Sequence, residues 1–274
     1  MPVLSKLEQL ENLIRSYGSC LVAYSGGVDS VFLAYVANKV LGSKALAVIA
    51  DSASLPRREF AEATEIAQKF SIPLRVVKTN EFENPDYLSN PNNRCYFCKH
   101  ELFTELEPIA KREGFAVIAY GENASDIGDF RPGAKAAGEF QVRAPLKEAG
   151  LTKTDIREFS EKFGLPTAAK PQMACLSSRV PYGESVSPEK LSMIEQAEYV
   201  LRDLGFYDVR VRHHELSGNK MVLARIEVGA EELPRLIDVK TSQQVFAALK
   251  KIGYTHVTVD LQGYRRGSLN YKNS

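Results

Sequence analysis

The sequence AYSGGVDSVFL, residues 23–33, gives the strongest indication of how this chain folds. It begins inside a short apolar run, passes through two adjacent glycines and enters a segment with helical spacing that ends at Gly42. This order predicts a buried strand, a tight turn and a helix. Glycines in such a turn let the backbone approach a phosphate, and amide groups at the helix start point toward the anion. We therefore expect a phosphate-binding loop where this strand ends.

Polar side chains within this loop indicate what it binds. Ser25 and Ser30 add hydroxyl donors beside Gly26 and Gly27, whereas Asp29 would repel a bare phosphate. The acid therefore suggests a Mg²⁺ ion between its carboxylate and the phosphates. The chain has neither the G-x-x-x-x-G-K-[ST] pattern of a Walker loop nor the G-x-G-x-x-G pattern of a dinucleotide site. A plain strand-to-helix turn is the alternative interpretation.

Strand and helix patterns alternate on both sides of this loop. Apolar strand-like runs occupy residues 20–27, 44–51, 73–79 and 115–123. Helical patterns occupy residues 1–19, 28–42, 56–71 and 96–113. Continuous apolar strands that alternate with helices predict an α/β fold, in which a parallel sheet is covered by helices on both faces.

The pattern changes after Thr167. Helical segments at 187–206 and 231–253 are combined with half-exposed strand patterns at 208–215, 221–228 and 256–261. These elements predict a smaller α+β domain. The segment 165–174 contains prolines and lysines and suits a boundary, so we expect one domain over 1–167 and a second over 168–274.

Composition limits the classes of partner. The chain has 274 residues, 44% hydrophobic and 25% charged, with a net charge of +1. This fits a soluble globular protein and gives no electrostatic case for binding nucleic acid or a membrane. We see no run of about 18 apolar residues that would span a membrane and no signal peptide. We expect a cytoplasmic protein, a homo-oligomer, whose partner is a small molecule.

Four cysteines raise the question of a metal or redox site. Cys20 begins the first strand and resembles a small buried hydrophobe. Cys95 and Cys98 form a C-x-x-C, and Cys175 follows 77 positions later, so only folding could bring the three together. They could bind zinc with His100, or a [4Fe–4S] cluster with one iron left open, or the pair could be a disulfide switch. With a nucleotide-binding loop in the same chain, we favour the open cluster.

The S-G-G-x-D-S loop between a buried strand and a helix resembles the pyrophosphate loop of the ATP pyrophosphatases. That superfamily includes NAD and GMP synthetases, asparagine synthetases and tRNA-thiolating enzymes. The resemblance implies that ATP is cleaved between its α and β phosphates. AMP would pass to a substrate oxygen, and a nucleophile would then displace it.

The same resemblance suggests further ATP-site residues. Asp51 and Ser52 end the second strand, where such enzymes hold the adenosine. In the segment 120–133, Asp126 and Asp129 could help to hold Mg²⁺, and Arg131 could meet phosphates. A polar surface loop is the alternative for this segment.

Later motifs make the resemblance more specific. They are DFRPG at 129–133, CLSSRVPYGE at 175–184, DVRVRHH at 208–214, LARIEV at 223–228 and VDLQGYRRGSLN at 259–270. Together with the loop, they look like the LarE family of ATP-dependent sulfur transferases, over nearly the whole chain. The resemblance implies adenylation of a carboxylate of pyridinium-3,5-biscarboxylic acid mononucleotide and its conversion to a thiocarboxylate. The product serves in making the nickel-pincer nucleotide cofactor.

The family has two sulfur chemistries. One sacrifices the sulfur of a single cysteine in the position of Cys175 and leaves dehydroalanine. The other carries a transferable sulfide on a [4Fe–4S] cluster held by three cysteines. Because this chain has the added C-x-x-C, it resembles the second kind, which implies catalytic roles for Cys95, Cys98 and Cys175 alongside Asp29. The sulfide source is unknown.

Charged residues of the second domain acquire candidate roles under this resemblance. Arg210 and Arg212 alternate on a strand, and guanidinium groups suit a nucleotide phosphate. The further substrate-binding candidates are Ser178, Arg179 and Arg265. Glu198 and Glu227 occupy segments that resemble metal-binding positions of the family. For each of these residues, a solvated surface position is the alternative, and the adjacent His213 and His214 give little indication of a metal.

Three other functions compete with this hypothesis. A tRNA-thiolating enzyme could use the same loop and cluster, but the chain lacks a basic patch. An ammonia-dependent synthetase would not need three cysteines. A nucleotide-binding module with a structural zinc would have no activity, and an assay for iron and sulfide distinguishes it from the cluster hypothesis.

Overall fold

The computed structural model describes residues 3–128, 132–171, 174–216 and 221–265. The chain divides into two compact units. Residues 1–81 and 93–174 form the first, here called the N-terminal unit, and residues 82–92 and 175–274 form the C-terminal unit. The sequence predicted a division between residues 167 and 168, with residues 82–92 in the first domain.

A four-stranded sheet is the centre of the N-terminal unit. Its strands are β1 (Cys20–Tyr24), β2 (Ala45–Asp51), β3 (Leu74–Lys78) and β4 (Val117–Tyr120). They are all parallel, in the order β3-β2-β1-β4. The α/β prediction is confirmed. All five residues of β1 are buried, whereas the edge strand β3 is only partly covered, with Val76 47% exposed.

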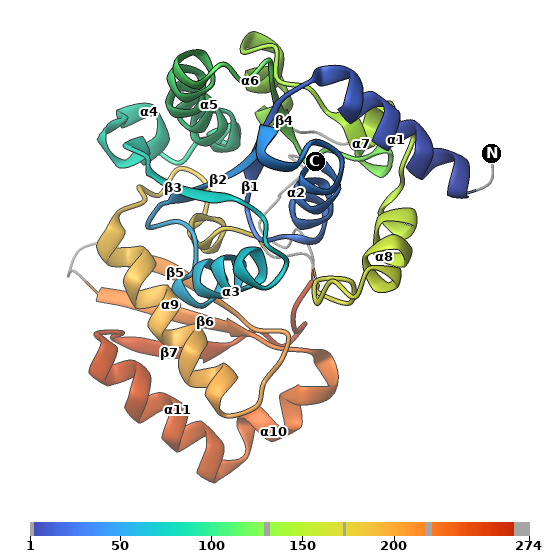
Figure 1. Ribbon diagram of the computed structural model, residues 1–274. Coiled ribbons are helices and arrows are strands. Elements are labelled where there is room, and N and C mark those ends of the chain that lie inside the picture. Colours follow the sequence, from blue (N-terminus) through green and yellow to red (C-terminus); the bar gives the residue numbers. More distant parts are fainter. Residues whose placement is uncertain (1–2, 129–131, 172–173, 217–220, 266–274) are drawn as a thin grey trace. The chain divides into compact units, whose positions relative to one another are not determined.

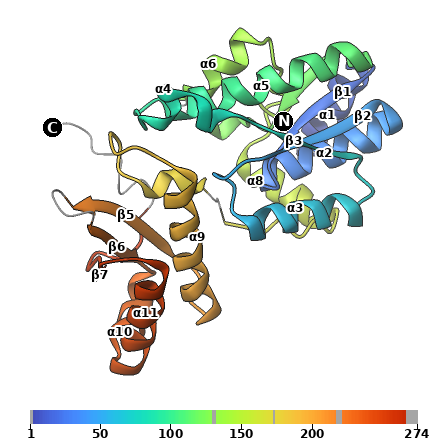
Figure 2. The same cartoon turned by 90° about the vertical axis from the view of Figure 1, so that its left-hand side faces the viewer.

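Helices cover both faces of this sheet (Figures 1 and 2). They are α1 (Val3–Tyr17), α2 (Val28–Leu41), α3 (Arg57–Lys69), α5 (Arg94–Glu113), α6 (Pro132–Glu139), α7 (Pro145–Glu148) and α8 (Lys153–Lys162). Side chains of β1 alternate between two cores. Val22 and Tyr24 pack with α1, α2, α3 and α8, while Leu21 and Ala23 pack with α5 and α6. A strand with two apolar faces is therefore fully buried, as its continuous apolar sequence predicts.

The C-terminal unit contains a three-stranded mixed sheet. Its strands are β5 (Arg210–Leu216), β6 (Met221–Glu227) and β7 (His256–Val259). β6 is central, antiparallel to β5 and parallel to β7. The helices are α4 (Pro85–Leu88), α9 (Pro188–Asp203), α10 (Leu233–Ile237) and α11 (Val239–Ile252). The helical pattern at 231–253 is divided at Asp238, because its carboxylate caps α11 by accepting from the amides of Lys240 and Thr241.

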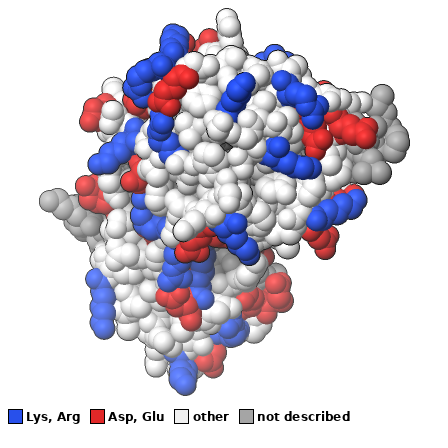
Figure 3. All heavy atoms as spheres, in the orientation of Figure 1, with Lys and Arg blue, Asp and Glu red and all other residues white. Residues whose placement is uncertain are grey.

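Short 3-10 helices complete the secondary structure: η1 (Gly42–Lys44), η2 (Glu81–Glu83), η3 (Ala124–Asp126), η4 (Leu176–Arg179) and η5 (Ala230–Glu232). Among the helices that the structure describes, none has the length and apolar character needed to cross a membrane. On the face drawn in Figure 3, basic side chains are interspersed with acidic ones, in keeping with the balanced composition.

Candidate active site

The loop that joins β1 to α2 contains one position where only glycine fits. Gly26 adopts φ +73°, and a Cβ there would lie 2.5 Å from the Cβ of Ala63 on α3. Gly27 is the N-cap of α2 and, having no side chain, leaves the helix start without a side-chain cap. Backbone amides at this end of α2 are therefore available for an anion.

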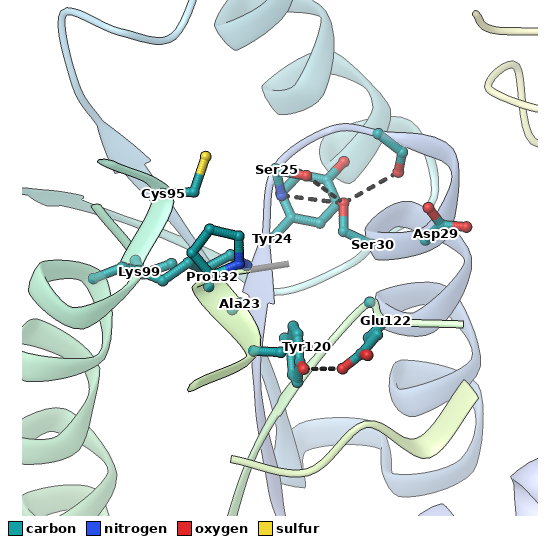
Figure 4. Close-up of a pocket in the computed structure, with 15 residues that line it drawn as sticks. Ala23, Tyr24, Ser25, Asp29, Ser30, Cys95, Lys99, Tyr120, Glu122 and Pro132 are labelled. Carbon is teal, nitrogen blue, oxygen red and sulfur yellow. Dashed lines mark hydrogen bonds between the residues drawn. The ribbon is translucent and has the colours of Figure 1, made fainter. Parts of the chain in front are cut away.

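Hydroxyl groups fix the shape of this loop. Ser30 donates to the carbonyl oxygen of Gly27 over 3.1 Å and accepts from the backbone amide of Ser25, also over 3.1 Å. The two serine hydroxyls lie 3.1 Å apart (Figure 4). Ser30 is buried and holds the turn, while Ser25 is exposed and can reach a ligand.

A cavity of about 340 Å³ opens beside the loop (Figure 4). Its wall combines Ser25, Gly27, Asp29 and Ser30 with the ends of three other elements. These contribute Tyr120, Gly121 and Glu122 after β4; Cys95, Lys99 and Leu102 from α5; and Pro132, Gly133 and Ala134 from α6. The end of β4 comes close to α2, since a Cβ on Gly121 would lie 3.0 Å from the amide nitrogen of Ser30. The predicted loop thus lines a cavity at the carboxyl edge of the sheet.

The cysteines are divided between the two units. Cys95 lies in the first turn of α5 and lines the cavity, and Cys98 follows one helical turn later. Cys175 precedes η4 in the C-terminal unit. All four cysteines carry thiols rather than disulfides. Within the described part of the chain, no group of three or more His, Cys, Asp and Glu side chains is arranged to hold a metal.

Cys20 is fully buried in β1, as its place in an apolar run predicts. Burial raises the pKa of its thiol to about 12, so the thiolate is strongly disfavoured. Cys20 therefore serves as a small core side chain.

Two residues that the sequence analysis missed hold the carboxylate of Asp29. The side-chain amide of Asn123 donates to Oδ1 over 3.3 Å, and the ammonium of Lys153 donates to Oδ2. Asn123 is the last residue of the predicted strand 115–123, so its position at the sheet edge could have been recognised. Lys153 is 124 positions from Asp29, and nothing in the local sequence links the two.

A second buried acid lines the cavity and was also missed. Glu122 accepts from the hydroxyl of Tyr120 at one oxygen and from the ammonium of Lys147, over 2.9 Å, at the other. Its side chain is 7% exposed, so the pair with Lys147 is shielded from water on one side. Sequence alone gave no signal, because a Gly-Glu-Asn turn is typical of a polar loop.

Other residues predicted for the ATP site have local partners and lie outside the cavity wall. Asp51 pairs with Arg57 over 2.5 Å, and Ser52 bonds to Ser54 and Glu81. Asp126 caps η3 by accepting from the amide of Asn123 over 3.1 Å. Asp129 and Arg131 lie outside the described residues.

In the C-terminal unit, Arg179 and Glu198 form a fully buried ion pair. Two nitrogens of Arg179 donate to the two carboxylate oxygens over 2.8 and 3.0 Å, and Arg202 adds a third bond of 3.0 Å. Burial favours the neutral acid, but the neighbouring guanidinium groups outweigh it and lower the pKa of Glu198. The hydroxyl of Ser178 accepts from Arg179 over 3.1 Å.

Arg212 and Glu227 form a second buried pair. Arg212 donates to both oxygens of Glu227 over 3.0 and 2.7 Å, and to the backbone oxygen of Ser178 over 2.9 Å. Arg225 bridges Glu227 and Asp260. The two acids suggested as metal ligands are therefore bound to arginines. The expectation of half-exposed strands is wrong for the first half of β5, where residues 210–213 are all buried.

Arg210 differs from these arginines. It is 6% exposed, lies 4.8 Å above the ring of Tyr264 and donates to the backbone oxygen of Val209. Among the described residues, it has no carboxylate within ion-pair distance. Burial and the positive charge of Arg179 lower its pKa, which marks a guanidinium whose charge is poorly compensated. Arg265 is exposed and bonds to Gln262.

The adjacent histidines have different surroundings. His213 is buried, with Nδ1 3.3 Å from the hydroxyl of Tyr254. Burial lowers the pKa of His213 to about 4, so it is neutral at pH 7. His214 is partly exposed and lies 3.3 Å from Arg225.

Replacing Gly26 by alanine is expected to reduce ATP-dependent AMP formation by about 100-fold. The new methyl group would displace α3 or the loop, and an alanine would be strained at the positive φ of residue 26. Gly114→Ala is a matched control, because Gly114 has φ +74° with open space around its Cβ position. It should cost about 1 kcal/mol of stability and leave AMP formation unchanged. Equal losses of activity would show that the close approach to Ala63 is unimportant.

Comparisons with known proteins show which families this chain is similar to. Residues 5–85 match the NAD synthase family model. An uncharacterized protein of Synechocystis sp. is 42% identical over 97% of both chains. The pyridinium-3,5-bisthiocarboxylic acid mononucleotide synthase of Lactiplantibacillus plantarum is 32% identical over 91% of this chain and 88% of its own. A component of the glutamine-hydrolyzing GMP synthase of Methanopyrus kandleri is 27% identical over 72% of this chain and 67% of its own. The chain therefore belongs to the family of pyridinium-3,5-bisthiocarboxylic acid mononucleotide synthase, the LarE family, within the ATP pyrophosphatase superfamily.

Proposed function

We propose that this chain is an AMP-forming sulfur transferase that acts on pyridinium-3,5-biscarboxylic acid mononucleotide. The observation that carries the proposal is that Cys95 and the pyrophosphate loop line the same cavity. A site that activates a carboxylate with ATP and a site that delivers sulfur must meet at one carbon atom. The name of the Lactiplantibacillus plantarum relative supports the same substrate class.

The cavity wall fits the triphosphate of ATP and a Mg²⁺ ion. The start of α2 has no side-chain cap, and Ser25 is exposed, so the loop offers donors for phosphate oxygens. Asp29 supplies a hard oxygen ligand for Mg²⁺, which would neutralise phosphate charge. A substrate carboxylate oxygen attacks the α phosphorus, and pyrophosphate leaves. We keep Asp51, Ser52, Asp126 and Arg131 as proposed contributors to the ATP site.

The three cysteines fit a sulfur carrier in part. Cys95 and Cys98 lie one turn apart near the start of α5, so two thiolates can face one group. Cys175 would add the third. A [4Fe–4S] cluster bound there would supply a transferable sulfide, because one iron would have no protein ligand. When sulfide attacks the adenylated carbonyl carbon, AMP leaves and a thiocarboxylate remains.

We propose the buried arginine cluster of the C-terminal unit as the site for the substrate phosphate. Glu198, Glu227 and Asp260 compensate Arg179, Arg202, Arg212 and Arg225. In the part of the chain that the structure describes, no carboxylate lies within ion-pair distance of Arg210, although Glu198 is close enough to act on its charge. An excess of buried positive charge favours an anion. Arg210 is thus the strongest candidate, with Ser178, Arg179, Arg212 and Arg265 around it. In this proposal Glu198 and Glu227 orient the arginines instead of binding a metal.

Replacing Arg210 by methionine is expected to weaken binding of the mononucleotide by about 10- to 100-fold, since one charge-assisted hydrogen bond is lost. ATP binding should be unchanged, and stability should be equal or higher. Arg212→Ala is the contrasting variant: it leaves Glu227 with less compensation in the core and should cost about 3–5 kcal/mol. Calorimetric binding and thermal melts measure both. Loss of ATP binding in Arg210→Met would contradict the assignment.

Product analysis tests the proposed function as a whole. The protein is incubated with ATP, Mg²⁺, sulfide and the biscarboxylate mononucleotide. We expect AMP, pyrophosphate and a thiocarboxylate, all dependent on the mononucleotide. ADP and phosphate would contradict the pyrophosphatase chemistry, and AMP formation that depends on tRNA instead would favour a tRNA-thiolating enzyme.

A further inference from the structure

Both oxygens of Asp29 are engaged by the protein itself. Asn123 donates to Oδ1, and the ammonium of Lys153 donates to Oδ2. A cation that binds Asp29 must therefore compete with a positive charge already present. The Asp29 and Lys153 side chains are 21% and 28% exposed, so the pair is reachable from solvent.

Hydrogen bonds fix the backbone around Lys153, whereas its long side chain can change conformation. Its amide donates to the hydroxyl of Ser125 over 3.0 Å, and Thr152 forms a capping box with Asp155 at the start of α8. The amide of Ala124 donates to the carbonyl oxygen of Leu151 over 2.8 Å, which ties the segment after β4 to the segment before α8. The ammonium can thus swing on its four-carbon stem while its origin stays beside the loop.

Charge explains what such a swing would achieve. Asp29 by itself would repel the phosphates of ATP, whereas the Asp29–Lys153 pair is neutral. If a divalent ion neutralised Asp29, the ammonium would lose its partner, and the phosphates of a bound ATP would offer it negative charge. Binding of the metal would then free the Lys153 ammonium for the phosphates.

We propose that Lys153 occupies the metal-binding oxygen of Asp29 in the nucleotide-free protein and moves to the departing pyrophosphate when Mg²⁺ and ATP bind. In this role, Lys153 first positions Asp29 and then stabilises the leaving group. The proposal rests on the AMP-forming reaction proposed above, but its first half concerns the nucleotide-free protein alone.

Lys153→Met tests both halves, because methionine keeps much of the apolar stem and removes the charge. Without the competing ammonium, the nucleotide-free variant should bind Mn²⁺, measured by electron paramagnetic resonance, about tenfold more tightly than the wild type. Its kcat for AMP formation should fall by about 100-fold, as when one transition-state donor is lost. The KM for ATP should change much less. Lys153→Arg should recover part of kcat and restore the weaker Mn²⁺ binding.

Lys39→Met is the matched control. Lys39 forms the same kind of pair, with Glu11 on α1 over 3.2 Å, but neither residue lines the cavity. This variant should change neither Mn²⁺ affinity nor kcat. Unchanged Mn²⁺ affinity in Lys153→Met would overturn the proposal, and so would an unchanged kcat. If the wild type formed no AMP at all, the proposed function would fail, while the Mn²⁺ comparison would still decide the first half.

Discussion

Asp29→Asn is expected to reduce the rate of AMP and pyrophosphate formation by about 1,000-fold, because a metal ligand loses its charge. The substitution preserves size, and the side chain can still accept from Asn123 at its remaining oxygen. Stability should therefore change little. Quenched-flow assays with labelled ATP measure the rate, and thermal melts measure stability.

A surface acid serves as the control for this variant. Glu113 pairs with Arg75 far along α5 and is absent from the cavity wall. Glu113→Gln should leave the rate unchanged, since a solvent-exposed ion pair contributes little to stability and this one lies outside the cavity wall. A rate for Asp29→Asn close to that of the wild type would refute the assignment of the metal and the phosphates to this loop.

Cys95→Ala is expected to stop sulfur transfer while adenylation persists. Cys95 lines the cavity, whereas the hydrogen bonds that hold the turn join Ser25, Gly27 and Ser30. Removing the sulfur of Cys95 should therefore leave these hydrogen bonds in place. We expect a loss of at least about 100-fold in thiocarboxylate formation, as for removal of a nucleophile or its carrier. Cys98→Ala and Cys175→Ala should behave alike, and all three should lose the absorbance of an iron–sulfur cluster.

Cys20→Ala is the control that distinguishes a specific loss of sulfur transfer from a general loss of stability. Cys20 is fully buried, so its loss should lower stability by about 1–2 kcal/mol without affecting the cluster or sulfur transfer. Sulfur transfer that survives in Cys95→Ala would exclude the C-x-x-C from the reaction.

Local sequence was sufficient to predict the sheet and the loop. Apolar runs separated by glycine turns and helices mark buried parallel strands, and Gly26 and Gly27 mark the turn itself. The partial exposure of β3 was harder to predict, because it depends on the sheet order β3-β2-β1-β4. In this order β3 is an edge strand, with a neighbour on one side only. In its sequence, PLRVVKT, only the two charged residues indicate that the strand is partly exposed.

Contacts between distant residues were not predictable in this way. Lys153 reaches Asp29 because the segments after β4 and before α8 are joined, and neither segment records this in its own pattern. Similarly, the sequence placed the arginines of β5 on a half-exposed strand. The register of β5 on β6, which aligns Arg210 with Glu227 and Arg212 with Arg225, brings acids among them and allows burial.

The unit to which residues 82–92 belong was also not predictable from local sequence. They follow the third strand in sequence but belong to the C-terminal unit. Asn90 is fully buried and donates to the backbone oxygens of Val180 and Pro181, while the amide of Val186 donates to Leu88. A short insertion of this kind carries no hydrophobic period of its own, so only its partners reveal where it belongs.

The mass of the intact chain after turnover tests the central claim, that three cysteines carry the sulfur without being consumed. Anaerobically reconstituted protein is supplied with ATP, sulfide and the biscarboxylate mononucleotide, and the chain and product are then analysed by mass spectrometry. We expect an unchanged polypeptide mass and more than one thiocarboxylate per chain. A chain that has lost sulfur at Cys175 to become dehydroalanine, with product limited to one sulfur per chain, would contradict it.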